Sequence, residues 1–165
     1  MDFPTDDDAV AHGAEPVGNV SDISTDEMRL LRCIRLWMVG PGYQELIWET
    51  LTRDRGTSGA KLERRALEGF MSNIAVSIDR RLARHGVACG CLGRDEAILL
   101  AIVRKATMGD RYSATVHAAG FVRADRVDVV VDAAEWLGQT MGQVSMTHGA
   151  DPVTLFPGSA PGTIH

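Results

Sequence analysis

The chain has 165 residues, of which 45% are hydrophobic and 24% charged, and its formal net charge is −5. This size and composition predict one compact domain with tails, large enough to bury a core without disulfides or metal. Aromatic residues make up only 5% of the chain. A core of aliphatic side chains suits packed helices better than a β-sandwich, so the composition favours an all-α fold.

Several classes of protein are excluded by what the sequence lacks. No apolar run approaches the roughly 18 residues that a membrane-spanning helix needs, and the first residues have neither the basic start nor the apolar stretch of a secretory signal. Three cysteines do not make the disulfide framework of a small secreted protein. We therefore expect a cytoplasmic protein that does not enter a membrane.

Charge is unevenly distributed along the chain. All 17 Lys and Arg lie between Arg29 and Arg126, so the two ends of the chain are acidic and its middle is basic. A basic middle could bind an anionic partner such as nucleic acid. The arginines follow no recognition-helix pattern, however, and polar helix faces commonly collect Arg. We therefore do not expect nucleic-acid binding.

The first predicted elements are a leader and two helices. Residues 1–23 show little hydrophobic periodicity and predict a disordered acidic leader. Ser24 and Glu27 have the spacing of a capping box, which predicts that a helix begins there. This helix ends at Gly40-Pro41-Gly42. A short helix follows, with Leu46, Ile47 and Leu51 on its apolar face.

The middle of the chain predicts a polar loop and then the longest helix. Residues 53–59 are polar and favour a loop, whereas residues 60–84 carry apolar side chains every three or four positions. Gly86 is a suitable stop for that helix, and residues 87–93 predict a tight connector. Asp95 and Glu96 follow it, as acidic side chains are stabilised in the first turn of a helix.

The remaining sequence predicts three helices and a loose C-terminal tail. The helix that begins near Asp95 runs to about Met108, and Asp110 is the expected cap of a short helix over residues 111–119. Asp125 is the expected cap of the last helix. Its first residues, 127–131, are β-branched and could form a strand, but the following residues favour a helix. The sequence therefore predicts an irregular bundle of five or six helices over residues 24–146, with disordered tails at 1–23 and 147–165.

One segment carries residues suited to chemistry. His85, Cys89 and Cys91 lie in the connector, where the flexible Gly90 would let two thiolates bind one metal ion. Structural zinc takes four ligands from Cys, His or carboxylate. Candidates for the fourth ligand are Asp95, His117, Cys33 or a water molecule.

Two other interpretations of these residues stay open. Cys89 and Cys91 could form a redox-sensing dithiol, although a disulfide between them would close a small, strained ring. Alternatively, both cysteines could simply pack as small apolar residues in a turn, with His85 favoured by the helix C-terminus.

The sequence contains none of the common nucleotide-binding or hydrolase motifs. An interaction or regulatory module that binds a protein partner or forms a homodimer is therefore expected rather than an enzyme. The alternatives are a zinc-binding helical protein and a thiol redox sensor.

Overall fold

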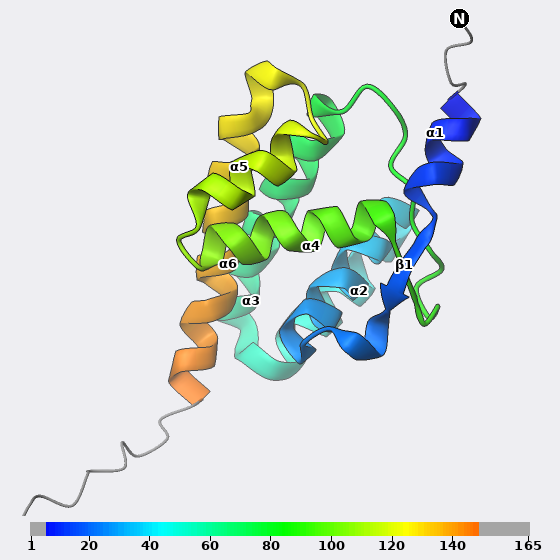
Figure 1. The fold of residues 1–165 in the computed structure, drawn as a ribbon. Helices are drawn as coiled ribbons and strands as arrows, with labels where there is room; N and C mark the ends of the chain where they lie inside the picture. The colour runs from blue at the N-terminus through cyan, green and yellow to red at the C-terminus, as the bar shows by residue number, and fades with distance from the viewer. Residues whose placement is uncertain (1–5, 149–165) are drawn as a thin grey trace, which may run out of the picture.

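The computed structural model describes residues 6–148, which form six α-helices and a two-stranded antiparallel sheet (Figure 1). The expected all-α class is therefore confirmed. The α-helices are α1 (Asp6–Gly13), α2 (Thr25–Val39), α3 (Gln44–Ser77), α4 (Arg94–Thr107), α5 (Arg111–Ala119) and α6 (Val127–His148). The strands are β1 (Pro16–Asn19) and β2 (Cys91–Gly93), and single 3₁₀ turns precede α2, α3 and α6 at η1 (Val20–Asp22), η2 (Pro41–Tyr43) and η3 (Ala124–Arg126).

The core is formed by the apolar faces of α2, α3, α4 and α6, with α5 packed against α4 and α6. Ile34, Phe70, Ile102 and Leu137 are completely buried, and each comes from a different one of these four helices. A buried ion pair also joins α2 to α3, because Arg29 lies 2.6 Å from Glu63. Within residues 6–148 no helix is long and apolar enough to span a bilayer.

Several helix boundaries lie where local sequence signals predicted them. The Ser24 hydroxyl accepts a hydrogen bond from the Glu27 backbone N–H, and the Glu27 carboxylate accepts one from Ser24 N–H at 3.0 Å. Asp110 likewise caps α5 by accepting from the Ser113 N–H at 3.1 Å. Residues 127–131 are helical and begin α6, which confirms the prediction of a helix rather than a strand at these residues. Asp125, expected to cap that helix, instead lies inside the turn η3.

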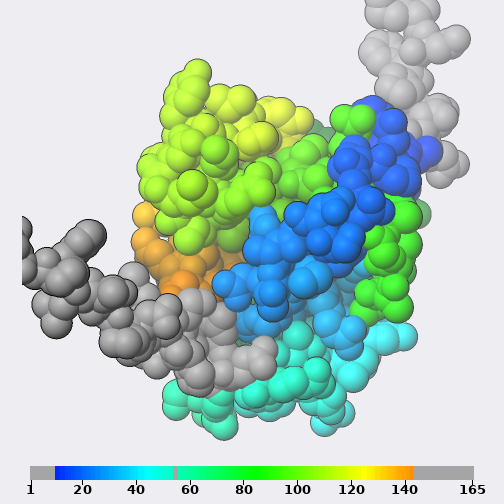
Figure 2. Space-filling model, turned by 60° about the horizontal axis from the view of Figure 1, so that its bottom comes forward, coloured from blue at the N-terminus to red at the C-terminus, as the bar shows by residue number. Residues whose placement is uncertain are grey.

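The predicted disordered leader is wrong for residues 6–22. These residues form α1, β1 and η1, and β1 pairs with β2 in a register that places Asn19 opposite Cys91. Figure 2 shows this N-terminal segment, in blue, running along the surface beside the connector, in green. The segment gains its structure from contacts with residues some 70 positions later, so its own sequence carries no periodic signal.

The long helix predicted over residues 60–84 both begins and ends earlier than expected, because it is the second part of α3. It ends at Ser77 instead of Arg84, and residues 78–90 run as an irregular connector to β2. Conversely, the loop expected at 53–59 is reduced to one non-helical residue, Gly56, whose φ of 67° kinks α3. The apolar periodicity identified the helix but did not fix its end, because the backbone after Ser77 is bound by acidic side chains of α4.

Candidate functional site

The connector is held in place by Glu96 in the first turn of α4. Its carboxylate forms two bonds with the Arg35 guanidinium, Nε–Oε1 and Nη2–Oε2, both of 2.8 Å. It also accepts from the backbone N–H groups of His85 and Gly93, each at 3.0 Å. Burial by itself would raise the pKa of Glu96, but the hydrogen bonds from Arg35 and these N–H groups hold that pKa below its ordinary value.

Arg35 completes the same arrangement from helix α2. The side chain is only 2% exposed, and its two terminal nitrogens donate to the backbone carbonyls of Gly86, Cys89 and Cys91 at 3.1, 2.7 and 2.7 Å. The connector is thus wrapped around a buried guanidinium whose bonds all go to Glu96 and to backbone oxygens. We did not predict this role for Arg35, although a charged residue four positions after Leu31 on an apolar stripe is a usable signal.

Asp95 fixes the other half of the connector. Its two oxygens accept from Arg80 at 2.6 and 2.7 Å, and one also accepts from the Ala83 N–H at 2.9 Å. A Cβ placed at Gly13 would overlap this carboxylate, so only glycine allows α1 to approach α4 so closely. Asp95 and Glu96 were expected to act through the helix dipole. In the fold they are fully buried ion-pair partners.

His85 and Cys89, two of the predicted site residues, do come together. His85 Nε2 lies 2.8 Å from the carbonyl oxygen of Ala14. A carbonyl can only accept, so Nε2 carries the hydrogen and Nδ1 presents a lone pair in the neutral ring. Nδ1 faces the Cys89 sulfur at 3.7 Å. The fold therefore selects the tautomer in which His85 can accept the thiol proton.

Cys91 lies beside Cys89 in the folded chain. Its backbone N–H donates to the Cys89 sulfur at 3.5 Å. The neighbouring Cys89 side chain raises the pKa of the Cys91 thiol above its ordinary value.

The structure gives little support to a metal centre at these residues. Among residues 6–148 no group of three or more His, Cys, Asp and Glu side chains is placed to hold a metal ion. Of the candidate fourth ligands, Asp95 is bound to Arg80, Cys33 is buried in the core and His117 is exposed on α5. Burial raises the pKa of Cys33 to about 12. Zinc binding stays a prediction, and the geometry favours a thiol–imidazole pair.

A small pocket opens beside Cys89. It has a volume of about 190 Å³, and its lining includes Cys89 and Ala88 from the connector, Leu31 and Arg32 from α2, and Val20 from η1. The Cys89 side chain is half-buried and Arg32 is exposed. A small molecule could therefore approach the sulfur beside an available positive charge.

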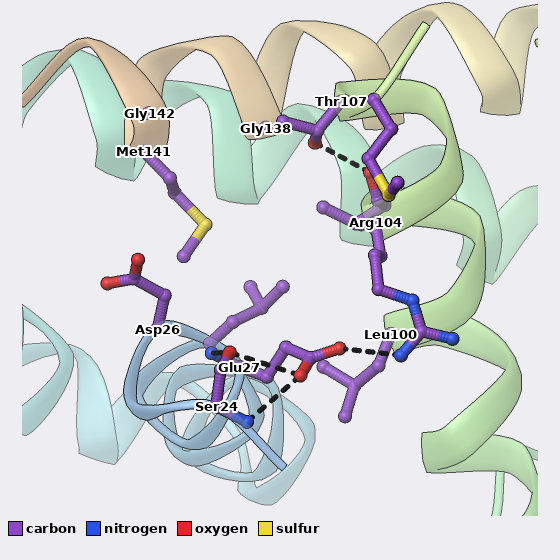
Figure 3. Close-up of a pocket in the computed structure, with 12 residues that line it drawn as sticks. Ser24, Asp26, Glu27, Leu100, Arg104, Thr107, Gly138, Met141 and Gly142 are labelled. Carbon is purple, nitrogen blue, oxygen red and sulfur yellow. Dashed lines mark hydrogen bonds and ion pairs between the residues drawn. The ribbon is translucent and has the colours of Figure 1, made fainter. Parts of the chain in front are cut away.

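A second and more apolar pocket lies at the opposite end of α4, between the start of α2, the last turns of α4 and the middle of α6 (Figure 3). Its volume is about 320 Å³, and its apolar lining includes Leu30, Leu100, Val103 and Met141. Polar groups lie at its edge, where Glu27 forms an ion pair with Arg104 at 3.1 Å.

Two glycines of α6 shape this pocket in different ways. A Cβ at Gly138 would overlap Thr107 of α4, so Gly138 allows the two helices to touch. A Cβ at Gly142 would meet no atom of the described residues within 4 Å, so among these residues Gly142 leaves open space in the pocket wall. This site was not predicted from the sequence. The only local signal was the pair of glycines four residues apart in a helix.

Comparisons with protein families, with curated proteins and with solved structures found no match to this chain. The site must therefore be interpreted from its own geometry.

Proposed function

We propose that the protein is a helical interaction module whose recognition site is the apolar pocket between α2, α4 and α6. The observation that carries this proposal is the open space of about 320 Å³ beside Gly142, walled by Leu30, Leu100 and Met141. Protein interiors are close-packed, and pockets that enclose drug-sized ligands have volumes of about 300–1,000 Å³. Space of this size at the surface suits one or two large apolar side chains.

The character of the walls supports binding of a peptide segment rather than a charged metabolite. Glu27 and Arg104, the charged pair at the edge, already bind each other. Met141 contributes a flexible and polarisable side chain, of the kind that adapts to different apolar partners. Affinity would therefore come mainly from burial of apolar surface.

The chain itself contains a segment of suitable chemistry. Val153, Leu155 and Phe156 lie between Pro152 and Pro157, in residues 149–165 beyond the described part. An extended chain spans roughly 23 Å over the seven residues from His148 to Leu155, whereas Gly142 lies only about 9 Å back along the helix. This segment is long enough to return to the pocket, and we propose it as the resident occupant that a partner segment would displace.

An apolar fluorescent dye, anilinonaphthalene sulfonate, tests the proposal on the full chain. We expect weak dye binding to the wild type and stronger binding to the variant Leu155→Ser/Phe156→Ser, because the pocket is vacated. Adding Gly142→Leu, whose Cβ would meet no described atom within 4 Å, should fill the open space and remove the gain. Gln139→Leu adds the same side chain on the exposed face of α6 and is the matched control.

Two results would contradict the proposal. One is equal dye binding by the wild type and the Leu155→Ser/Phe156→Ser variant. The other is a gain in dye binding that Gly142→Leu leaves unchanged. A synthetic peptide of residues 149–165 should also displace the dye from the vacated variant.

A further inference from the structure

Cys89 differs from the other two cysteines in its surroundings, and none of these residues belongs to the pocket of the proposed function. Cys33 is only 1% exposed, within the core. The neighbouring Cys89 side chain raises the pKa of Cys91. Cys89 is half-buried, accepts the Cys91 N–H at 3.5 Å and faces His85 Nδ1 at 3.7 Å. Cys89 is therefore the sulfur that has both an imidazole nitrogen and a backbone N–H donor beside it.

His85 is held in the orientation that a base requires. The bond from Nε2–H to the Ala14 carbonyl fixes the ring, and the backbone N–H of His85 is bound to Glu96. This is the arrangement of an activated nucleophile, in which a third group orients the base. Because Ala14 belongs to the N-terminal segment, the pair is complete only when that segment is packed on the connector.

The pocket beside Cys89 indicates which molecules could reach the sulfur. Its apolar lining includes Val20, Met28 and Leu31, and its charged lining includes Arg32. Arg35 also lines it, but the Arg35 donors are bound to Glu96 and to backbone carbonyls. Arg32 is exposed and forms no hydrogen bond or ion pair with another residue in 6–148. It can therefore bind the carboxylate of an incoming molecule.

We infer that Cys89 is a reactive thiol that forms a mixed disulfide with small anionic disulfides, with His85 as its base and Arg32 as the anion-binding group. His85 Nδ1 takes the proton of the Cys89 thiol, and the sulfur attacks one sulfur of the disulfide. The disulfide bond of the small molecule breaks as the new bond to Cys89 forms. The released thiolate takes the proton from His85 and leaves as a thiol, so one disulfide is consumed and one is formed.

The rates of two thiol reagents test this inference. Dithiobis(nitrobenzoate) is an anionic disulfide and dithiodipyridine is a neutral one, and both release a coloured thiol on reaction. We expect one rapid equivalent per chain with either reagent, lost in Cys89→Ser and retained in Cys91→Ser. Peptide mapping by mass spectrometry should place the first adduct on Cys89.

Substitutions of the two assisting residues separate their roles. Arg32→Gln should slow the anionic reagent by about two- to fivefold, as expected for one exposed charge pair, with no change for the neutral reagent. Arg53→Gln removes an exposed charge that does not line this pocket and should change neither rate. His85→Gln should slow both reagents by about tenfold or more, since it removes the base.

Three results would overturn the inference. The first is labelling of Cys91 or Cys33 before Cys89. The second is an Arg32→Gln variant in which the two reagents slow equally. The third is a rise in the Cys89 rate on addition of a chelator, which would show that a metal ion occupies the thiols instead. Arg32 is exposed, so its variant keeps the inference testable even where His85→Gln perturbs the fold.

Discussion

At the first turn of α4, Asp95 and Glu96 are completely buried and each is paired with an arginine from another part of the chain. At the last turns of the same helix, Val103 and Thr107 line an apolar pocket that the described chain leaves open. The polar end binds Arg80, Ala83 and His85 of the irregular segment 78–90 and the backbone N–H of Gly93 in β2. The apolar end contacts α2 and α6 and is shaped by the absence of two side chains, at Gly138 and Gly142.

The contrast shows how one helix can serve two purposes. A buried charge is tolerated when it is paired and hydrogen-bonded, as Asp95 and Glu96 are, so we expect the polar end to have one preferred arrangement. The Ala14 carbonyl and the Glu96 carboxylate hold His85 there, with Nδ1 3.7 Å from the Cys89 sulfur. Apolar contacts are not directional, so the other end can accept side chains of different shapes. We therefore expect substitutions at the polar end to act on stability and those in the pocket to act mainly on binding.

The largest expected effect is loss of the charge of Glu96. Glu96→Gln leaves the Arg35 guanidinium buried without a counter-ion, which costs about 3–5 kcal/mol for a buried pair. Urea denaturation should show this loss. The control is Glu68→Gln, which breaks the exposed pair of Glu68 with Arg64 and should cost less than about 1 kcal/mol. Similar losses of unfolding free energy in the two variants would show that the buried pair does not contribute more to stability than the exposed pair.

A smaller effect is expected from the two glycines of α6. Gly138→Ala places a methyl group against Thr107, and overpacking of this kind costs about 1–3 kcal/mol. Gly142→Ala meets nothing and should be neutral or stabilising by up to about 1 kcal/mol, since alanine favours helices. Thermal unfolding of the two variants gives the comparison directly. Equal melting temperatures would show that the approach of α4 to α6 is not as close as described.

Acid should weaken the polar end selectively. The pKa of Glu96 is lowered in the fold from an ordinary value of 4.5. Its ionised form therefore adds stability above that value, and this contribution is lost as the pH falls through the folded pKa. The urea midpoint of the wild type should fall as the pH drops below about 4.5. The Glu96→Gln variant should show a smaller fall, and an equal fall in both would exclude Glu96 as a source of the acid sensitivity.

Signals within a few residues were sufficient to predict several parts of the fold. The caps at Ser24 and Asp110 depend on a side chain and a backbone N–H three residues apart, so they can be recognised from spacing alone. The helical start of α6 was predicted from the residues that follow it. The proximity of His85 and Cys89 was also expected, although it arises in the irregular connector rather than at a helix end.

Features that depend on distant partners could not be predicted. Arg35 binds groups 51 to 61 positions later in the chain, so its place on an apolar stripe could indicate burial but could not identify its partners. The N-terminal segment is ordered by pairing with β2. The apolar pocket is formed by three helices, and its only local sequence signal was the pair of glycines Gly138 and Gly142. Contacts between residues far apart in the sequence therefore form both the buried ion pairs at the start of α4 and the apolar pocket at its end.

We propose that the open end of α4 is a recognition site that binds apolar segments, beginning with residues 153–156. Methyl-detected NMR on the full chain tests it most directly, through nuclear Overhauser effects from the Phe156 ring. The proposal predicts such effects to the methyl groups of Leu100, Val103 and Met141, and their loss in the variant Leu155→Ser/Phe156→Ser. Absence of these effects, with unchanged methyl shifts of the three pocket residues in that variant, would contradict it.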